Sequence, residues 1–160
     1  MYDFDTVVDR RNTGSLKWDV AENELPMWVA DMDFKTAPQI IEAISARVSH
    51  GVFGYSIIPD EWNDAYISWW DRRHGLKIER DSLIFCTGVV PAISSTVRKL
   101  TTPGENVLIM TPVYNIFFNS IFNNGVNVQE SPLGYENGRY FVDYDRLEQD
   151  LSNPQTSLMI

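Results

Sequence analysis

The sequence has little cysteine, little histidine and a deficit of positive charge. Cys86 is the single cysteine among 160 residues, so it can form no intrachain disulfide and cannot hold a metal cluster unaided. We predict that it is buried as a small apolar side chain. His50 and His74 each precede a glycine at a predicted helix end, and we interpret both as capping or solvated residues. No metal site is therefore predicted.

Charge and hydrophobicity exclude further classes of partner. The 13 basic residues are outnumbered by 22 acidic ones, and no cluster of Lys and Arg offers a surface for nucleic acid or anionic lipid. No stretch approaches the ~18 apolar residues of a membrane span, and the first residues lack the basic and apolar regions of a signal peptide. We expect a soluble cytoplasmic protein with no nucleic-acid partner and no membrane contact.

The first 50 residues are predicted to form an extended arm followed by a helix. Residues 1–35 show no helical period, whereas apolar residues recur at helical spacing over 37–49. Thr36 and Gln39 have the spacing of a capping box, and Pro38 suits a first helical turn. After a glycine-punctuated loop at 51–58, the rhythm of aromatic and apolar residues from Trp62 predicts a second helix that ends at Gly75.

Beyond residue 80 the pattern alternates between strand and helix. Short apolar runs predict strands at 83–86, 107–110, 126–128 and 157–160. Helices are predicted from 89 to 100, from 114 to about 123 and from 143 to 151, with an Asn-Gly hairpin turn at 137–138. Continuous apolar strands separated by helices indicate an α/β fold, with a mainly parallel sheet covered by helices on both faces. The run 157–160 resembles a strand that has barely begun, so we expect these residues to be the first part of a longer chain.

Two turns after predicted strands are candidate binding sites, since ligands of open α/β sheets lie beyond the carboxyl ends of the strands. At Thr87–Ala92 a strand breaks at Gly88 and a helix begins, so free backbone amides there suit a phosphate. The glycine could equally serve only a tight strand-to-helix turn. The turn lacks the Lys-Ser/Thr end of a P-loop and is no dinucleotide fingerprint.

The second turn carries Tyr114, directly after the next predicted strand. An aromatic ring beside a phosphate cradle could stack on a flat heterocycle, or it could simply pack at the rim of the sheet. In the arm, Asp31 and Asp33 stand two residues apart and would point the same way from an extended backbone. We interpret them as a solvated or capping pair in preference to an acid/base pair.

Five motifs in order carry a family resemblance. They are Met27-Trp28-Val29-Ala30-Asp31-Met32-Asp33-Phe34, Gly54-Tyr55, Thr87-Gly88-Val89-Val90-Pro91-Ala92, Pro103-Gly104-Glu105 and Thr111-Pro112-Val113-Tyr114. These motifs resemble the amino-terminal part of the pyridoxal-phosphate C–S lyases of the MalY/PatB type. This cystathionine β-lyase or cysteine desulfhydrase branch belongs to the class I/II aminotransferase superfamily. The resemblance implies the fold of a fold-type I pyridoxal-phosphate (PLP) transferase, with residues 1–49 in a small domain and 50–160 starting the large PLP-binding domain.

The resemblance also implies roles for individual residues. Val89 and Val90 match the positions whose backbone amides hold the cofactor phosphate, and Tyr114 matches the aromatic that stacks on the pyridine ring. Tyr55 is similar to a tyrosine that reaches the partner's cofactor across a homodimer interface, so the active site would be shared. Ala30 lies in the region where backbone groups approach the substrate carboxylate.

The catalytic machinery of the family is not found in this stretch. Those enzymes bind PLP through a lysine in a Ser-x-x-Lys run, and none of Lys17, Lys35, Lys77 and Lys99 has that context. We therefore assign no catalytic residue among these 160. The resemblance implies α,β-elimination of a sulfur amino acid such as cystathionine or cysteine, giving a thiol or sulfide, pyruvate and ammonia. A PLP-dependent aminotransferase and a regulatory binding protein on the same fold are the alternatives.

Overall fold

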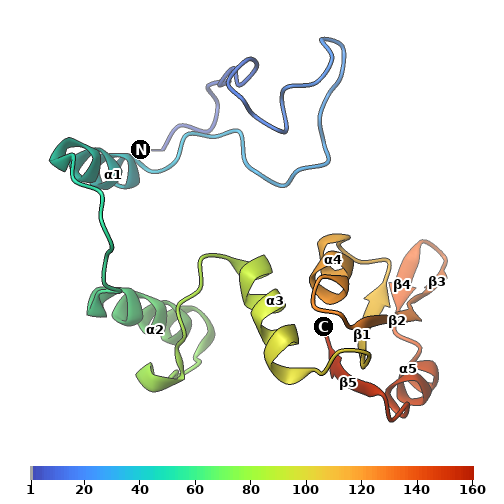
Figure 1. The fold of residues 1–160 in the computed structure, drawn as a ribbon. Coiled ribbons are helices and arrows are strands. Elements are labelled where there is room, and N and C mark those ends of the chain that lie inside the picture. The colour runs from blue at the N-terminus through green and yellow to red at the C-terminus, as the bar shows by residue number, and fades with distance from the viewer. Residues whose placement is uncertain (1) are drawn as a thin grey trace. The chain divides into compact units, whose positions relative to one another are not determined.

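A computed structural model describes residues 2–160 (Figure 1). Contacts divide the chain into two compact units, one ending at Ile57 and the other running from Ile58 to Ile160. Each unit is described by itself below. Within residues 2–160, no helix combines the length and the apolar character needed to cross a membrane.

The first unit consists of an arm and one helix. Residues 2–37 contain neither helix nor strand, and α1 (Pro38–His50) follows, as predicted. The predicted capping box is wrong, because the N-cap is Ala37 and no side chain caps the helix. Pro38 holds the first helical position, which leaves Thr36 outside the helix. The helix ends at Gly51, whose φ of 75° is the left-handed conformation that glycine adopts without strain.

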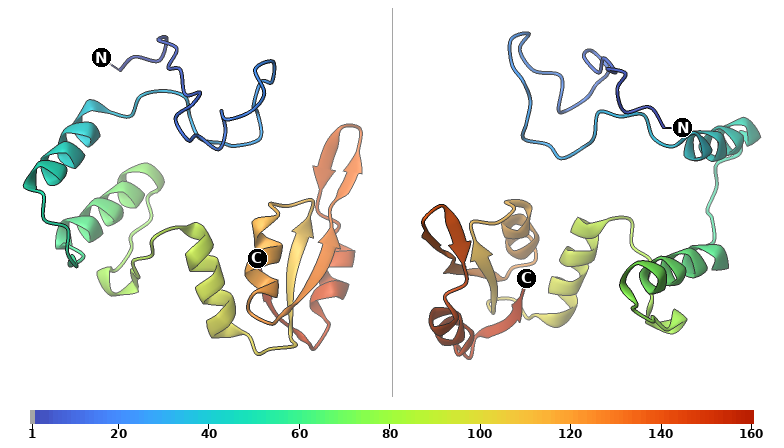
Figure 2. Two further views of the ribbon diagram at one scale, coloured as in Figure 1. Left: turned by 45° about the horizontal axis from the view of Figure 1, so that its top comes forward. Right: turned by 180° about the vertical axis from the view of Figure 1, so that it is seen from behind.

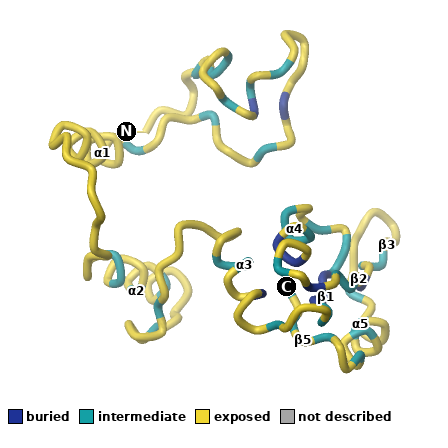
Figure 3. The backbone as a smooth tube through the Cα atoms, viewed as in Figure 1, coloured by how far each residue is buried: buried dark blue, intermediate teal, exposed yellow. Residues whose placement is uncertain are grey.

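No residue of α1 is buried (Figure 3). Its apolar side chains share one stripe, yet each remains about half exposed: Ile40 50%, Ile41 47%, Ile44 59% and Val48 59%. An amphipathic helix gains stability by burying such a stripe. Within its own unit, α1 therefore has an unpartnered apolar face.

The second unit begins with α2 (Asp60–His74), where a helix was predicted. Its aromatic residues contact one another along the helix. The rings of Trp62 and Tyr66 are stacked with centroids 5.7 Å apart, and those of Tyr66 and Trp70 are tilted with centroids 6.1 Å apart. A short 3₁₀ helix, η1 (Arg80–Ser82), follows. The guanidinium of Arg80 binds the carboxylate of Asp60 at 2.6 Å and that of Asp64. These ion pairs tie η1 to the start of α2.

The strand predicted at 83–86 is wrong, as is the prediction that Cys86 is buried. The segment is extended but pairs with no strand among residues 2–160, and Ile84 is 90% exposed. The thiol of Cys86 is exposed as well. A strand exists through hydrogen bonds to a neighbouring strand, so an apolar run without a neighbour stays a loop. The ring of Phe85 packs edge-on against that of Trp62.

The rest of the second unit is an α/β layer structure. Its elements in chain order are α3 (Val89–Leu100), β1 (Asn106–Thr111), α4 (Ile116–Phe122), β2 (Asn127–Pro132), β3 (Gly134–Glu136), β4 (Arg139–Phe141), α5 (Tyr144–Leu151) and β5 (Thr156–Met159). The main sheet has the order β2-β1-β5. Both pairs are parallel, as predicted. Strands β3 and β4 form the predicted hairpin, with Asn137 and Gly138 at positive φ in its turn.

Helices cover both faces of this sheet (Figure 2). Val107 and Ile109 of β1 are fully buried on one face, where they join a core with residues of α3 and α4. Leu108, between them, faces the other side by strand alternation. Gln129, paired with Leu108 in register, donates to the backbone carbonyl of Asp150 in α5. Helix α5 therefore lies on that second face.

Candidate functional site

The start of α3 and the carboxyl ends of the strands lie at one edge of the sheet. Helix α3 leads through a turn into the beginning of β1, so its own beginning lies toward the strand ends. A cavity of about 240 Å³ shows this directly, since it is lined by the first turns of α3 and by the end of β5. Its lining residues are Ala92, Ile93, Thr96, Leu158, Met159 and Ile160. This edge is where ligands bind in open α/β sheets.

Two backbone amides are unpaired at the start of α3. The first amide that donates a hydrogen bond at this end belongs to Ala92, which bonds the carbonyl of Gly88 at 3.1 Å. The amides of Val89 and Val90 have no acceptor within residues 2–160, Pro91 has no N–H, and no side chain caps the helix. Because α3 is 12 residues long, its dipole adds to the attraction of these amides for an anion.

Space for a ligand exists next to Gly88. Its backbone is extended, and a Cβ atom placed there would meet only the ring of Pro91 among the described residues, 3.5 Å from Cδ. That separation is an ordinary contact. Neither the backbone nor the packing of this turn therefore requires glycine, which argues against the alternative that Gly88 serves only a tight turn.

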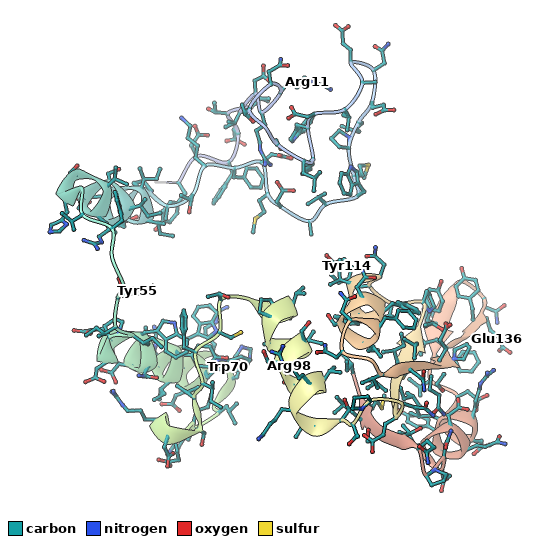
Figure 4. All side chains as sticks on the ribbon, viewed as in Figure 1. Arg11, Tyr55, Trp70, Arg98, Tyr114 and Glu136 are labelled. Atoms are coloured by element: carbon teal, nitrogen blue, oxygen red, sulfur yellow. The ribbon has the colours of Figure 1, made fainter. Side chains whose placement is uncertain are left out.

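Tyr114 lies at the same edge, between the end of β1 and the start of α4 (Figure 4). Its side chain is 59% exposed, and its ring meets that of Phe117 edge-on at 5.9 Å between centroids. The edge-to-face contact helps to orient the ring, and its 59% exposure leaves it accessible to a stacking ligand. The second unit thus brings Val89, Val90 and Tyr114 to one edge.

Ala30 and Tyr55 belong to the first unit. Ala30 is exposed in the arm, and its amide donates to no acceptor within residues 2–160. Tyr55 is fully exposed on the extended segment that follows α1 (Figure 4). Both residues are accessible within their unit.

The arm contains a polar cluster that sequence reasoning missed. The Asp33 carboxylate accepts hydrogen bonds of 2.7 Å from three side chains, the Arg10 guanidinium, the Lys17 ammonium and the Trp18 indole N–H. Arg10 also binds the carboxylate of Asp31 at 2.6 Å. Asp31 and Asp33 do point the same way, but their interpretation as a solvated or capping pair is wrong. Their partners stand 14 to 23 residues away in sequence, where no local pattern reveals them.

These contacts determine the charge state of the cluster. Hydrogen bonds from Lys17, Trp18 and Arg10 hold the pKa of the Asp33 carboxyl well below its usual range. Hydrogen bonds to Asp33 and Asp31 raise the pKa of the Arg10 guanidinium above its ordinary value. Lys17 is buried within this cluster, whereas Lys35, Lys77 and Lys99 are exposed.

Comparison with known families assigns the chain to one of them. Residues 22–160 match the family of aminotransferases of class I and II. The chain belongs to this family. The match includes both turns at the sheet edge and the part of the arm that holds Ala30.

Curated relatives align with almost the whole of this sequence. The chain is 39% identical to cystathionine beta-lyase PatB of Bacillus subtilis over 163 aligned residues, covering 98% of this chain and 42% of that protein. It is 35% identical to protein MalY of Escherichia coli, covering 100% of this chain and 43% of that protein. The chain thus spans less than half the length of these relatives.

A solved structure supports the fold class. Cystalysin of Treponema denticola, which contains a pyridoxal 5'-phosphate cofactor, superposes with a TM-score of 0.90 at 36% identity. The superposition covers 99% of this chain and 42% of cystalysin. The predicted fold class, that of fold-type I PLP-dependent transferases, is confirmed for this part of the fold.

Proposed function

We propose that this chain is the amino-terminal portion of a PLP-dependent C–S lyase. The observation that carries the proposal is the pair of unpaired amides of Val89 and Val90, at the same sheet edge as the exposed ring of Tyr114. A ligand that carries both a phosphate and an aromatic ring would use both features, the free amides for its phosphate and the exposed ring for stacking. Membership of the class I/II family and 39% identity to a cystathionine beta-lyase support this choice of ligand and reaction.

The residues at this edge fit PLP. The amides of Val89 and Val90 would donate to its phosphate, whose negative charge the start of α3 favours. The open space at Gly88 would let the phosphate approach the backbone. Tyr114 would hold the pyridine ring by stacking. When bound, PLP supplies an electron sink for the electrons left at the substrate Cα.

The proposed reaction is α,β-elimination. A proton leaves Cα, the bond between Cβ and sulfur breaks, and the sulfur departs with the electron pair as a thiol or sulfide. Water then converts the remaining fragment to pyruvate and ammonia. Within this chain, the free amide of Ala30 would donate to the substrate carboxylate and so orient the amino acid. Cystathionine or cysteine is the proposed substrate.

The proposal includes a homodimer with a shared active site. Tyr55 is fully exposed, and its hydroxyl would contact the cofactor phosphate of the partner. The unpartnered apolar face of α1 is consistent with further burial in an assembly. We also propose that residues 1–49 belong to a small domain and that residues 50–160 start the large PLP-binding domain.

The test of the proposed reaction uses the full-length protein loaded with PLP. Incubation with cystathionine should release pyruvate and ammonia in the absence of any keto acid. Strict dependence on a keto-acid acceptor would instead identify an aminotransferase. If neither reaction occurs although PLP is bound, the lyase proposal fails.

A further inference from the structure

We propose that Asp33 is a positioning residue for substrate binding. The proposal rests on the function above, in which the backbone at Ala30 meets the substrate carboxylate. The side chains of Arg10, Lys17, Trp18 and Asp33 are called the Asp33 clamp here. The clamp holds the neighbouring backbone in place, and it does so without contacting the substrate itself.

Within residues 2–160, every hydrogen bond that holds residues 25–34 involves the clamp. Among the described residues, this stretch makes no backbone-to-backbone hydrogen bond. The Lys17 ammonium donates both to the carbonyl of Asp31, at 2.9 Å, and to the Asp33 carboxylate, at 2.7 Å. Arg10 bridges the carboxylates of Asp31 and Asp33. Asp31 directly follows Ala30. The contacts that fix the carbonyl and the side chain of Asp31 therefore act one residue away from the proposed contact between Ala30 and the substrate.

Phe34, the residue after Asp33, makes an aromatic contact that supports the clamp. The rings of Phe4 and Phe34 meet edge-on with centroids 5.3 Å apart. Residues 31, 33 and 34 are therefore all attached to residues 4–18. Segments that are tied at several points keep their backbone orientation, and an oriented amide binds its ligand at a lower entropic cost.

The charges of the clamp and of Asp31, which Arg10 also binds, balance. Arg10 and Lys17 contribute two positive charges, and Asp31 and Asp33 contribute two negative ones. The clamp and Asp31 together therefore exert little net attraction on the substrate carboxylate. Replacing Asp33 by Asn leaves a net positive charge beside the site. Electrostatics alone would then lower KM for an amino acid, whereas loss of positioning would raise it, so the direction of the change separates the two effects.

The experiment uses full-length PLP-loaded protein and the variant Asp33→Asn. We expect KM for cystathionine to rise about tenfold, since hydrogen bonds to a charged group are lost and a factor of ten corresponds to about 1.4 kcal/mol. The value of kcat and the absorbance band of bound PLP should stay near those of the unsubstituted protein. Asp60→Asn is the matched control, because it also removes a carboxylate bound to an arginine, and it should leave KM unchanged.

A second measurement does not depend on activity. Limited proteolysis by chymotrypsin should cut the arm after Trp28 about tenfold faster in Asp33→Asn than in the Asp60→Asn control, because local opening exposes the backbone to the protease. Unchanged cleavage would overturn the proposal. An unchanged or lower KM would overturn it as well, as would a fall in kcat and in the unfolding midpoint with KM constant.

The two proposals fail in different ways. If the unsubstituted protein binds PLP but releases no pyruvate from cystathionine, the lyase function fails. Cleavage of the arm then still decides whether the Asp33 clamp holds residues 25–34. If pyruvate is released and Asp33→Asn changes neither KM nor cleavage, the function stands and the positioning role of Asp33 is wrong.

Discussion

Different forces stabilise the two units of this chain, each considered by itself. In the second unit, Val107, Leu108 and Ile109 are fully buried in a sheet that helices cover on both faces. In the first unit, the order of the arm depends on the ionic contacts of Asp33, and α1 buries no residue. Dehydrated apolar packing is insensitive to salt and pH, whereas partly exposed ion pairs respond to both.

This difference indicates what kind of binding site each unit can provide. A close-packed sheet gives the turns at its edge fixed positions, as a site for a rigid cofactor requires. An arm held by a few polar contacts can be ordered or released at small cost, which suits the proposed contact of its backbone with the substrate. The predictions below test this contrast, beginning with the largest effect.

The core of the second unit should respond most strongly to truncation. Ile109→Ala removes a fully buried side chain, and we expect it to lower the free energy of unfolding by about 2–5 kcal/mol. Ile44→Ala removes the same atoms from the exposed face of α1 and should cost less than about 1 kcal/mol. Urea unfolding of the 160-residue chain measures both. Equal losses would show that the face of α1 is buried.

Tyr114 should affect cofactor retention without affecting the core. Tyr114→Ala removes the stacking ring, and we expect PLP to bind about tenfold more weakly to the full-length protein. Because the ring is 59% exposed, the unfolding midpoint of the cofactor-free protein should change little. Tyr114→Phe keeps the ring and is the matched control. Titration of PLP followed by its absorbance checks the result, and equal retention in all three proteins would remove Tyr114 from the site.

The clamp of the first unit should depend on pH. The pKa of Asp33 is lower in the folded chain than its usual value of about 3.9, so its stabilising contribution is complete above that value. The contribution is lost as the pH falls from about 4 toward the lowered pKa. The difference in urea midpoint between the native chain and Asp33→Asn should therefore shrink with acidification. A difference that stays constant down to low pH would contradict this linkage.

The smallest effect is expected at the ion pair of Arg80 and Asp60. Both side chains are well exposed, at 45% and 84%, so water screens their attraction. Asp60→Asn should change the free energy of unfolding by less than about 1 kcal/mol, and less than Asp33→Asn does at neutral pH. Urea midpoints measured in parallel test this ranking. A reversed order would mean that the ionic contacts of the arm contribute less than their geometry indicates.

Local pattern was sufficient for much of the fold. Apolar spacing predicted α1, α2 and α3, and continuous apolar runs predicted the strands that became β1, β2 and β5. The same kind of run at 83–86 failed, because pairing requires a neighbouring strand that the described residues do not provide. The prediction that Cys86 is buried is wrong as well. The two turns at the sheet edge were recognisable because a parallel sheet brings all its carboxyl ends together.

The sequence by itself determined where most of the helices and strands lie, since their positions depend on side-chain spacing, glycine and proline over a few residues. It also placed Val89 and Val90 at the start of a helix and Tyr114 directly after a strand. Only the tertiary structure decided that two amides at α3 remain unpaired and that Asp33 joins Arg10, Lys17 and Trp18. Such contacts join residues that are distant in sequence, and they form only when the chain closes loops that no local pattern encodes.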